Sequence, residues 1–98
     1  MTSAFDPEGF EAAVLAGVPE LNGAHVLEIG AGDGRLTWHY AARARSVVGV
    51  DPEAESVGYL MEDRPPGLRP RVTGVIADAE HLPFPSERFD AAVLSWSL

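Results

Sequence analysis

Apolar residues gather in four short runs along this chain, and each run ends in or leads into a polar residue. The runs are His25 to Ile29, Ser46 to Asp51, Arg71 to Ala77 and Phe89 to Ser95. Their length and their content of β-branched residues are typical of strands that are buried on both faces of a parallel sheet. We therefore predict four strands over these ranges.

Between these strands, apolar residues recur at helical spacing. Leu36, Tyr40 and Ala44 share one face, which predicts a helix from about residue 34 to residue 44. A second helix is predicted to open at residues 51–53, because an aspartate followed by a proline is a helix-start signal.

A further helix is predicted ahead of the first strand. Asp6 followed by Pro7 is a start signal, and Gly17 is a stop signal. We expect residues 1–23 to form an N-terminal helix and turn, and residues 24–98 to form the main unit of the chain.

Strands that alternate with helices in this way predict parallel βαβ units with right-handed crossovers. The predicted fold class is α/β: a partial, Rossmann-like, doubly wound parallel sheet. Numbered along the chain, its four strands are expected in the order 3-2-1-4, with helices on both faces.

The most distinctive local pattern is an acid, Glu28, followed by glycines at alternate positions: Gly30, Gly32 and Gly34. Such glycines permit a tight turn and let a ligand lie against the backbone. In the dinucleotide fingerprint G-x-G-x-x-G, the third glycine would stand one position later, where this chain has Arg35. A phosphate-binding P-loop is excluded because the chain contains no lysine. A carboxylate ahead of the loop favours a cationic ligand, or one rich in amino donors, over a pyrophosphate.

Polar residues lie at the carboxyl ends of all four predicted strands. They are Glu28, Asp51, Asp78 and Ser95. Ligands of open α/β sheets bind outside these ends, near the point where the strand order reverses. The four positions together indicate a ligand site more strongly than the glycine loop does alone.

Composition narrows the classes of partner. The chain has 98 residues, of which 46% are hydrophobic, so it can build one core. Its formal net charge of -8 argues against a nucleic-acid partner, since phosphate binding needs clustered bases. It has no cysteine, and its three histidines lack metal-ligand spacing, so we expect no metal site. No apolar run reaches the ~18 residues of a membrane span, and we expect a cytoplasmic protein with no membrane partner.

At this point the residues resemble the class I S-adenosylmethionine-dependent methyltransferases, especially the type 11 group. The matching segments, in family order and spacing, are residues 26–34 for the first motif, 48–51 for the acidic end of the second strand, and 77–85 and 89–95 for the third and fourth motifs.

The resemblance implies that the cofactor is S-adenosyl-L-methionine. Asp51 would accept hydrogen bonds from the ribose hydroxyls, Asp78 would accept one from the adenine amino group, and Glu28 would support the glycine loop on the ammonium side. The residues implied to bind the cofactor are Glu28, Gly30, Ala31, Gly32, Gly34, Asp51, Pro52, Asp78, Ala79 and Ser95. No catalytic residue is identified. The expected partner is a small-molecule methyl acceptor.

The family's fold continues beyond the point where this sequence stops. We therefore expect the N-terminal, cofactor-binding half of a methyltransferase, either as a truncated gene product or as a fragment that needs a partner. The strand 89–95 would then present an exposed apolar edge that promotes self-association. Two alternatives stay open: a fragment of an NAD(P)-dependent oxidoreductase, and a non-catalytic relative that binds a partner protein.

Overall fold

A parallel β-sheet forms the centre of the molecule. The computed structural model describes residues 2–5 and 19–95. The helix predicted between Asp6 and Gly17 lies outside these described residues. The strands are β1 (Thr2–Phe5), β2 (His25–Ile29), β3 (Ser46–Asp51), β4 (Val72–Ile76) and β5 (Ala91–Leu94).

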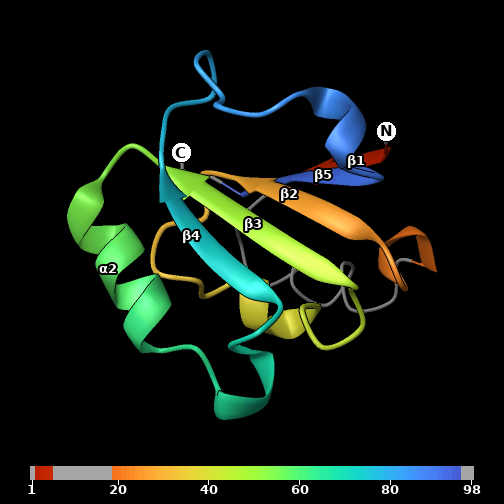
Figure 1. Cartoon of the computed structure of the whole chain (residues 1–98), viewed down its shortest axis with the longest axis horizontal. Helices are drawn as coiled ribbons and strands as arrows, with labels where there is room; N and C mark the ends of the chain where they lie inside the picture. The colour runs from red at the N-terminus through yellow and green to blue at the C-terminus, as the bar shows by residue number, and fades with distance from the viewer. Residues whose placement is uncertain (1, 6–18, 96–98) are drawn as a thin grey trace.

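The strands lie in the order β1-β5-β2-β3-β4, and every neighbouring pair is parallel (Figure 1). The predicted order 3-2-1-4 corresponds to β4-β3-β2-β5 and is confirmed. The predicted bounds of β2 and β3 are also those of the structure. The polar residues that follow these strands are therefore brought to one edge of the sheet.

The outer edge of β5 differs from the prediction. β1 pairs with it in parallel, in a register that sets Thr2 opposite Ala91 and Phe5 opposite Leu94. The expectation that residues 89–95 would form an open sheet edge was therefore wrong, and so was the route to self-association through that edge. A short N-terminal strand supplies the backbone partners that an edge strand lacks.

One regular helix is found among the described residues, α2 (Ala54–Glu62), which follows β3 as predicted. The helix predicted over 34–44 is replaced by the 3-10 helix η2 (Thr37–His39) flanked by turns. Several amides of this segment bond to the carbonyl three residues back, as Tyr40 does to Thr37. Threonine and aromatic residues have modest helix propensity, and the hydroxyl groups of Thr37 and Tyr40 bond to Glu28 of β2.

Three other 3-10 turns connect the elements: η1 (Pro19–Leu21), η3 (Pro66–Leu68) and η4 (Ser86–Arg88). The turn predicted at 21–23 is present directly after η1. No helix in the described part of the chain is long and apolar enough to cross a membrane.

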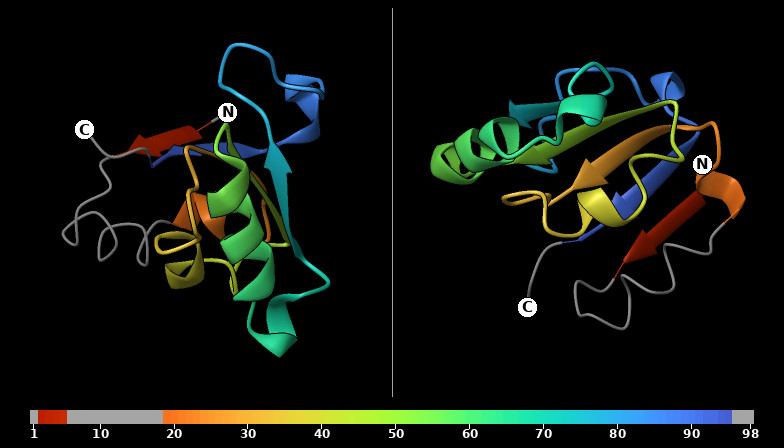
Figure 2. Two further views of the ribbon diagram at one scale, coloured as in Figure 1. Left: turned by 90° about the vertical axis from the view of Figure 1, so that its left-hand side faces the viewer. Right: turned by 90° about the horizontal axis from the view of Figure 1, so that it is seen from below.

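The two faces of the sheet are covered in different ways (Figures 1 and 2). On one face, strand residues such as Val26 and Val47 pack with Leu60 of α2 and with Tyr40 of the segment 34–44. On the other face, residues of the loop 77–90 cover the strands, and Phe84 meets Phe89 edge to face at 5.3 Å between ring centroids. Among the described residues, the regular helix α2 lies on the first face, and the second face is covered by the loop that contains the short 3-10 turn η4.

Candidate functional site

The carboxyl ends of β2, β3 and β5 meet at one edge of the sheet. The register sets Ile29 of β2 opposite Val50 of β3 on one side and opposite Leu94 of β5 on the other. Gly30 and Ala31 extend this pairing, because both of their amides donate to the carbonyl oxygen of Val50, at 2.9 and 3.0 Å. The glycine loop is thus anchored to β3 before it turns away from the sheet.

The turn needs glycine for two different reasons. Gly32 has φ of +57°, and a Cβ built on it would meet nothing within 4 Å, so this position faces open space. Gly34 has φ of +93°, and a Cβ there would stand 2.7 Å from the ring of Trp38. Only glycine adopts such conformations at little cost. Gly32 therefore offers bare backbone to a ligand, while Gly34 lets the chain pass under an indole ring.

Ala31 has a different place from the glycines. Its side chain is buried and points at Gly49 of β3, where an added Cβ would lie 2.9 Å from the Ala31 Cβ. Ala31 can contribute to a ligand site only through its backbone.

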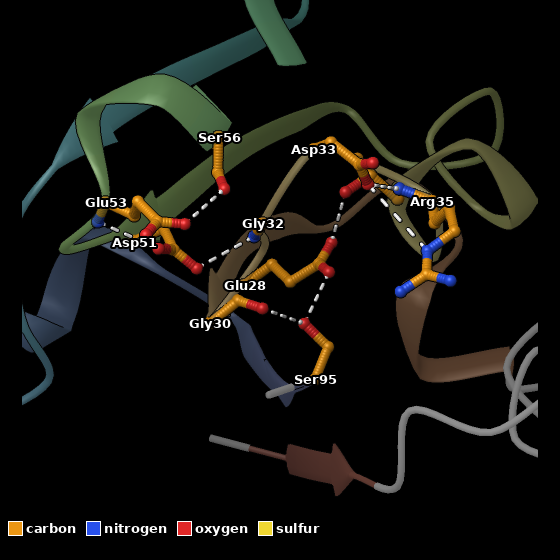
Figure 3. Close-up of polar contacts among 10 residues, drawn as sticks. Glu28, Gly30, Gly32, Asp33, Arg35, Asp51, Glu53, Ser56 and Ser95 are labelled. Atoms are coloured by element: carbon orange, nitrogen blue, oxygen red, sulfur yellow. Dashed lines mark hydrogen bonds and ion pairs between the residues drawn. The ribbon is translucent and has the colours of Figure 1, made fainter. Parts of the chain in front are cut away.

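Asp51, at the end of β3, joins the glycine loop to the start of α2 (Figure 3). Its Oδ2 accepts a hydrogen bond from the amide of Gly32 at 3.0 Å, and its Oδ1 accepts one from the amide of Glu53 at 2.9 Å. The carboxylate is half-buried. Because each oxygen of a carboxylate can accept two hydrogen bonds, acceptor capacity remains at the site.

Glu28 is enclosed entirely. Its side chain has 0% exposure, and three hydroxyl groups donate to it. Thr37 and Tyr40 donate to Oε1 at 2.7 and 2.5 Å, and Ser95 donates to Oε2 at 2.6 Å. The Glu28 carboxylate of β2 thereby links two hydroxyls of the segment 34–44 to Ser95, the residue that follows β5. Support of the glycine loop by Glu28 stays a prediction: the three bonds join Glu28 to the segment after the loop and to Ser95.

Burial has electrostatic consequences for this group. It raises the pKa of Glu28, and the hydrogen bonds from Ser95, Tyr40 and Thr37 offset part of that rise. Burial, together with the negative charge of Glu28, raises the pKa of Tyr40 well above its usual range. A buried carboxylate keeps its place at this depth only because its oxygens are hydrogen-bonded.

The sequence reasoning missed Thr37 and regarded Tyr40 as a packing residue. A signal was present: a glutamate inside an apolar strand needs buried donors. Hydroxyl residues spaced three apart on the inner face of the following segment are the nearest candidates for that role.

Ser95 is the residue that closes the site on the β5 side. It is buried, its amide donates to the carbonyl oxygen of Ile29 at 2.9 Å, and its hydroxyl lies 3.1 Å from the carbonyl oxygen of Gly30. Figure 3 shows this hydroxyl between Gly30 and Glu28.

Asp78, beyond the end of β4, has an exposed carboxylate. It accepts hydrogen bonds from the amide of Glu80 and from Nδ1 of His81, both at 2.9 Å. The hydrogen bond from His81 is the main reason why the pKa of Asp78 is lowered. Ala79, like Pro52 after β3, is exposed.

The predicted site residues thus fall into two groups. Hydrogen bonds link Glu28, Gly30, Gly32, Asp51 and Ser95 into one frame through their neighbours. Asp78 and Ala79 lie in the neighbouring loop, which the amide of Ala77 ties to the carbonyl oxygen of Asp51 at 3.1 Å. Open backbone at Gly32 beside a carboxylate with unused acceptor capacity suits a ligand with vicinal hydroxyl groups.

Comparison with known proteins identifies the class. A "Methyltransferase domain" family matches residues 26–98, which include the glycine loop and the ends of all the central strands. The chain belongs to this methyltransferase-domain family, whose members use S-adenosyl-L-methionine.

Individual relatives agree with this assignment. The demethylmenaquinone methyltransferase of Thermobifida fusca is 34% identical over 86 residues, which are 88% of this chain and 36% of that protein. Phosphoethanolamine N-methyltransferase 1 of Haemonchus contortus, solved with phosphoethanolamine and S-adenosylhomocysteine, has a similar fold. It is 29% identical, with a TM-score of 0.72, over 85% of this chain and 17% of that one.

The 23S rRNA methyltransferase ErmE is also similar in structure, with 30% identity and a TM-score of 0.65. The match covers 84% of this chain and 33% of the ErmE chain. The present chain therefore spans between 17% and 36% of the length of these three relatives, and one of them is named as an rRNA methyltransferase. The expectation that nucleic acid is excluded as a partner has no support from these comparisons.

Proposed function

We propose that this chain is the cofactor-binding part of an S-adenosyl-L-methionine-dependent methyltransferase that acts on a small-molecule acceptor. The observation that carries the proposal is the bond between Asp51 Oδ2 and the amide of Gly32. It places a carboxylate acceptor directly beside open glycine backbone. A ribose diol fits such a carboxylate, which accepts hydrogen bonds and donates none.

The remaining residues suggest how the cofactor would be held. The loop from Gly30 to Gly34 would lie under its methionine and ribose parts. Asp78 would accept a hydrogen bond from the adenine amino group, and the amide of Ala79 would face a ring nitrogen. The cofactor, when bound, supplies an electrophilic methyl group on a sulfonium centre.

The chain's own contribution to catalysis would be orientation. Methyl transfer to an activated acceptor is an in-line displacement, and correct positioning accounts for much of the rate in such reactions. Ser95 directly follows β5, next to the glycine loop, and would approach the reactive end of the cofactor. We assign no general base.

Two observations favour a small-molecule methyl acceptor: the net charge of the chain and the name of one relative. The chain has 15 acidic and 7 basic residues, and this excess of acids favours a small-molecule acceptor over RNA, whose phosphates bind to clustered basic residues. The relative from Thermobifida fusca is named for a small-molecule substrate, demethylmenaquinone. An RNA acceptor is the second candidate, because ErmE shares the fold. A cytoplasmic location of the protein stays a prediction from the sequence.

Binding calorimetry tests the proposal. S-adenosylhomocysteine should bind to the chain, and NAD⁺ should not bind at the same concentrations. Asp51→Ala should weaken S-adenosylhomocysteine binding, while Asp63→Ala, which removes an exposed carboxylate at the end of α2, should not. NAD⁺ binding with S-adenosylhomocysteine failing to bind would favour the oxidoreductase alternative. If neither ligand gives a heat of binding, the result would favour the alternative that the chain is a non-catalytic relative.

A further inference from the structure

The hydroxyl of Ser95 has more acceptors in reach than it has protons. It lies 2.6 Å from Oε2 of Glu28, 3.1 Å from the carbonyl oxygen of Gly30 and 3.4 Å from that of Ile29. A serine hydroxyl donates one hydrogen bond at a time. A carbonyl oxygen can accept two hydrogen bonds, so the direction of this single O–H decides whether the protein occupies one acceptor position of the Gly30 carbonyl or leaves both open to a ligand.

The state of Glu28 sets that direction. When Glu28 is ionised, neither of its oxygens carries a proton. The Ser95 hydroxyl then makes its shortest and strongest hydrogen bond to Oε2, because hydrogen bonds to a charged acceptor are stronger. If Oε2 carries a proton, it donates that proton to Oγ of Ser95. The Ser95 proton must then turn to another acceptor, and the Gly30 carbonyl is the nearer of the two that remain.

Tyr40 and Thr37 control the other oxygen of the same carboxylate. Both donate to Oε1, and the side chains of all three residues are buried. Among the described residues, Tyr40 is the titratable group bonded to Glu28. Two donors on one oxygen favour the charged carboxylate over the neutral acid.

We infer that Tyr40 and Thr37 are positioning residues of the cofactor site. By holding Oε1 of Glu28, they keep the Ser95 hydroxyl directed at Oε2, which leaves both acceptor positions of the Gly30 carbonyl oxygen open to the ammonium group of the ligand. This inference rests on the proposed function for the identity of the ligand. The link from Tyr40 and Thr37 through Glu28 to the Ser95 hydroxyl, here called the relay, is a property of the protein alone.

Carbon-13 NMR of the ligand-free chain tests the relay. We expect the Gly30 carbonyl signal and the Glu28 Cδ signal to titrate together with pH. Tyr40→Phe should move their shared midpoint to higher pH, because it removes a donor that favours the charged form. The matched control is Tyr59→Phe, which deletes the same hydroxyl from a tyrosine that is 52% exposed on α2, and it should leave the midpoint unchanged.

Ser95→Ala is the second arm, because it removes the hydroxyl that turns. Glu28 should still titrate in this variant, while the Gly30 carbonyl should no longer follow it. A Gly30 signal that ignores Glu28 in the unaltered chain would overturn the inference. So would an equal response to Tyr40→Phe and Tyr59→Phe. If Tyr40→Phe does not fold, Thr37→Val should raise the midpoint and Thr37→Ser, which keeps a hydroxyl, should restore it.

Calorimetry at a pH between the two midpoints adds the ligand. Tyr40→Phe should weaken binding of S-adenosylhomocysteine by up to about tenfold, because the Ser95 hydroxyl then occupies one of the two acceptor positions of Gly30 and one hydrogen bond sets the upper limit of the loss. It should leave 5′-methylthioadenosine, which lacks the ammonium group, unaffected. Equal losses for both ligands would contradict the role of Gly30. If the unaltered chain binds neither ligand, the proposed function fails, and the NMR arm still decides the relay.

Discussion

Asp51 and Gly32 are 19 positions apart in the sequence, yet the carboxylate of the first accepts a hydrogen bond from the amide of the second at 3.0 Å. The bond ties the end of β3 to a glycine of the loop at which an added Cβ would meet nothing within 4 Å. It also brings two separate sequence motifs together at one site, because a ligand that lies on the loop at Gly32 would lie beside the carboxylate of Asp51.

We predict that Asp51 matters more for cofactor binding than Asp33 does. Asp51→Ala should cost about 1.5 to 3 kcal/mol of binding free energy, as expected for hydrogen bonds to a charged group. Asp33 is exposed and bonds only locally, to the amide of Arg35, so Asp33→Ala should cost well under that. Titration calorimetry of both variants with S-adenosylhomocysteine gives the order. Equal losses would refute the assignment.

The stability of the loop should depend on Gly34. Gly34→Ala places a Cβ 2.7 Å from the Trp38 ring at a φ of +93°, so it should lower the free energy of unfolding by roughly 2–4 kcal/mol. Gly58→Ala is the matched control: this site in α2 has nothing within 4 Å, and alanine should stabilise the helix by about 1 kcal/mol. Urea unfolding measures both. A stable Gly34→Ala variant would contradict the described loop.

Glu28 should make stability depend on pH in a definite direction. Its pKa is raised in the folded chain, so the folded state holds this proton more tightly than the unfolded state does. Its contribution is therefore fully present below the unfolded pKa, near 4.5, and is lost as pH rises through the folded pKa.

The comparison with Glu28→Gln isolates this effect. The difference in unfolding free energy, unaltered chain minus variant, should fall as pH rises above about 4.5, by at most about 1.4 kcal/mol per pH unit. Urea unfolding over a pH series provides the curve. A difference that grows with pH would mean that the bonds from Ser95, Tyr40 and Thr37 outweigh burial.

The N-terminal strand should protect the sheet. Deleting residues 2–5 removes the backbone partner on the outer edge of β5, so the shortened chain should self-associate at concentrations where the whole chain does not. Sedimentation over a range of concentrations measures this. If both chains sediment alike, the pairing of β1 with β5 does not govern association.

The sheet could be predicted because its information is local. A buried parallel strand is an uninterrupted apolar run, and the runs at 25–29 and 46–51 have sharp polar limits. The crossover rules then limited the possible strand orders, of which the predicted 3-2-1-4 is one. β1 carries no such signal: it spans only four residues, and its partner lies near the other end of the chain.

The polar residues at the strand ends of the candidate site were predicted for the same reason. The hydrogen bonds inside the candidate site were not predicted. Glu28, Asp51 and Ser95 are visible as polar residues at strand ends. The roles of Thr37 and Tyr40 depend on a fold-back that sets their hydroxyls against Glu28, and apolar spacing over 34–44 suits an ordinary helix equally well. Periodicity shows which side of a segment is buried but not which hydrogen bonds form there.

The central claim is that the glycine loop and Asp51 bind S-adenosyl-L-methionine, and amide NMR with S-adenosylhomocysteine tests it most directly. We predict that the largest shifts on titration fall on the amides of Gly32, Glu53 and Ala79. Amides at the opposite ends of the strands, such as that of His25, should stay unchanged. Shifts confined to residues away from the loop, or the same pattern produced by NAD⁺, would contradict the account.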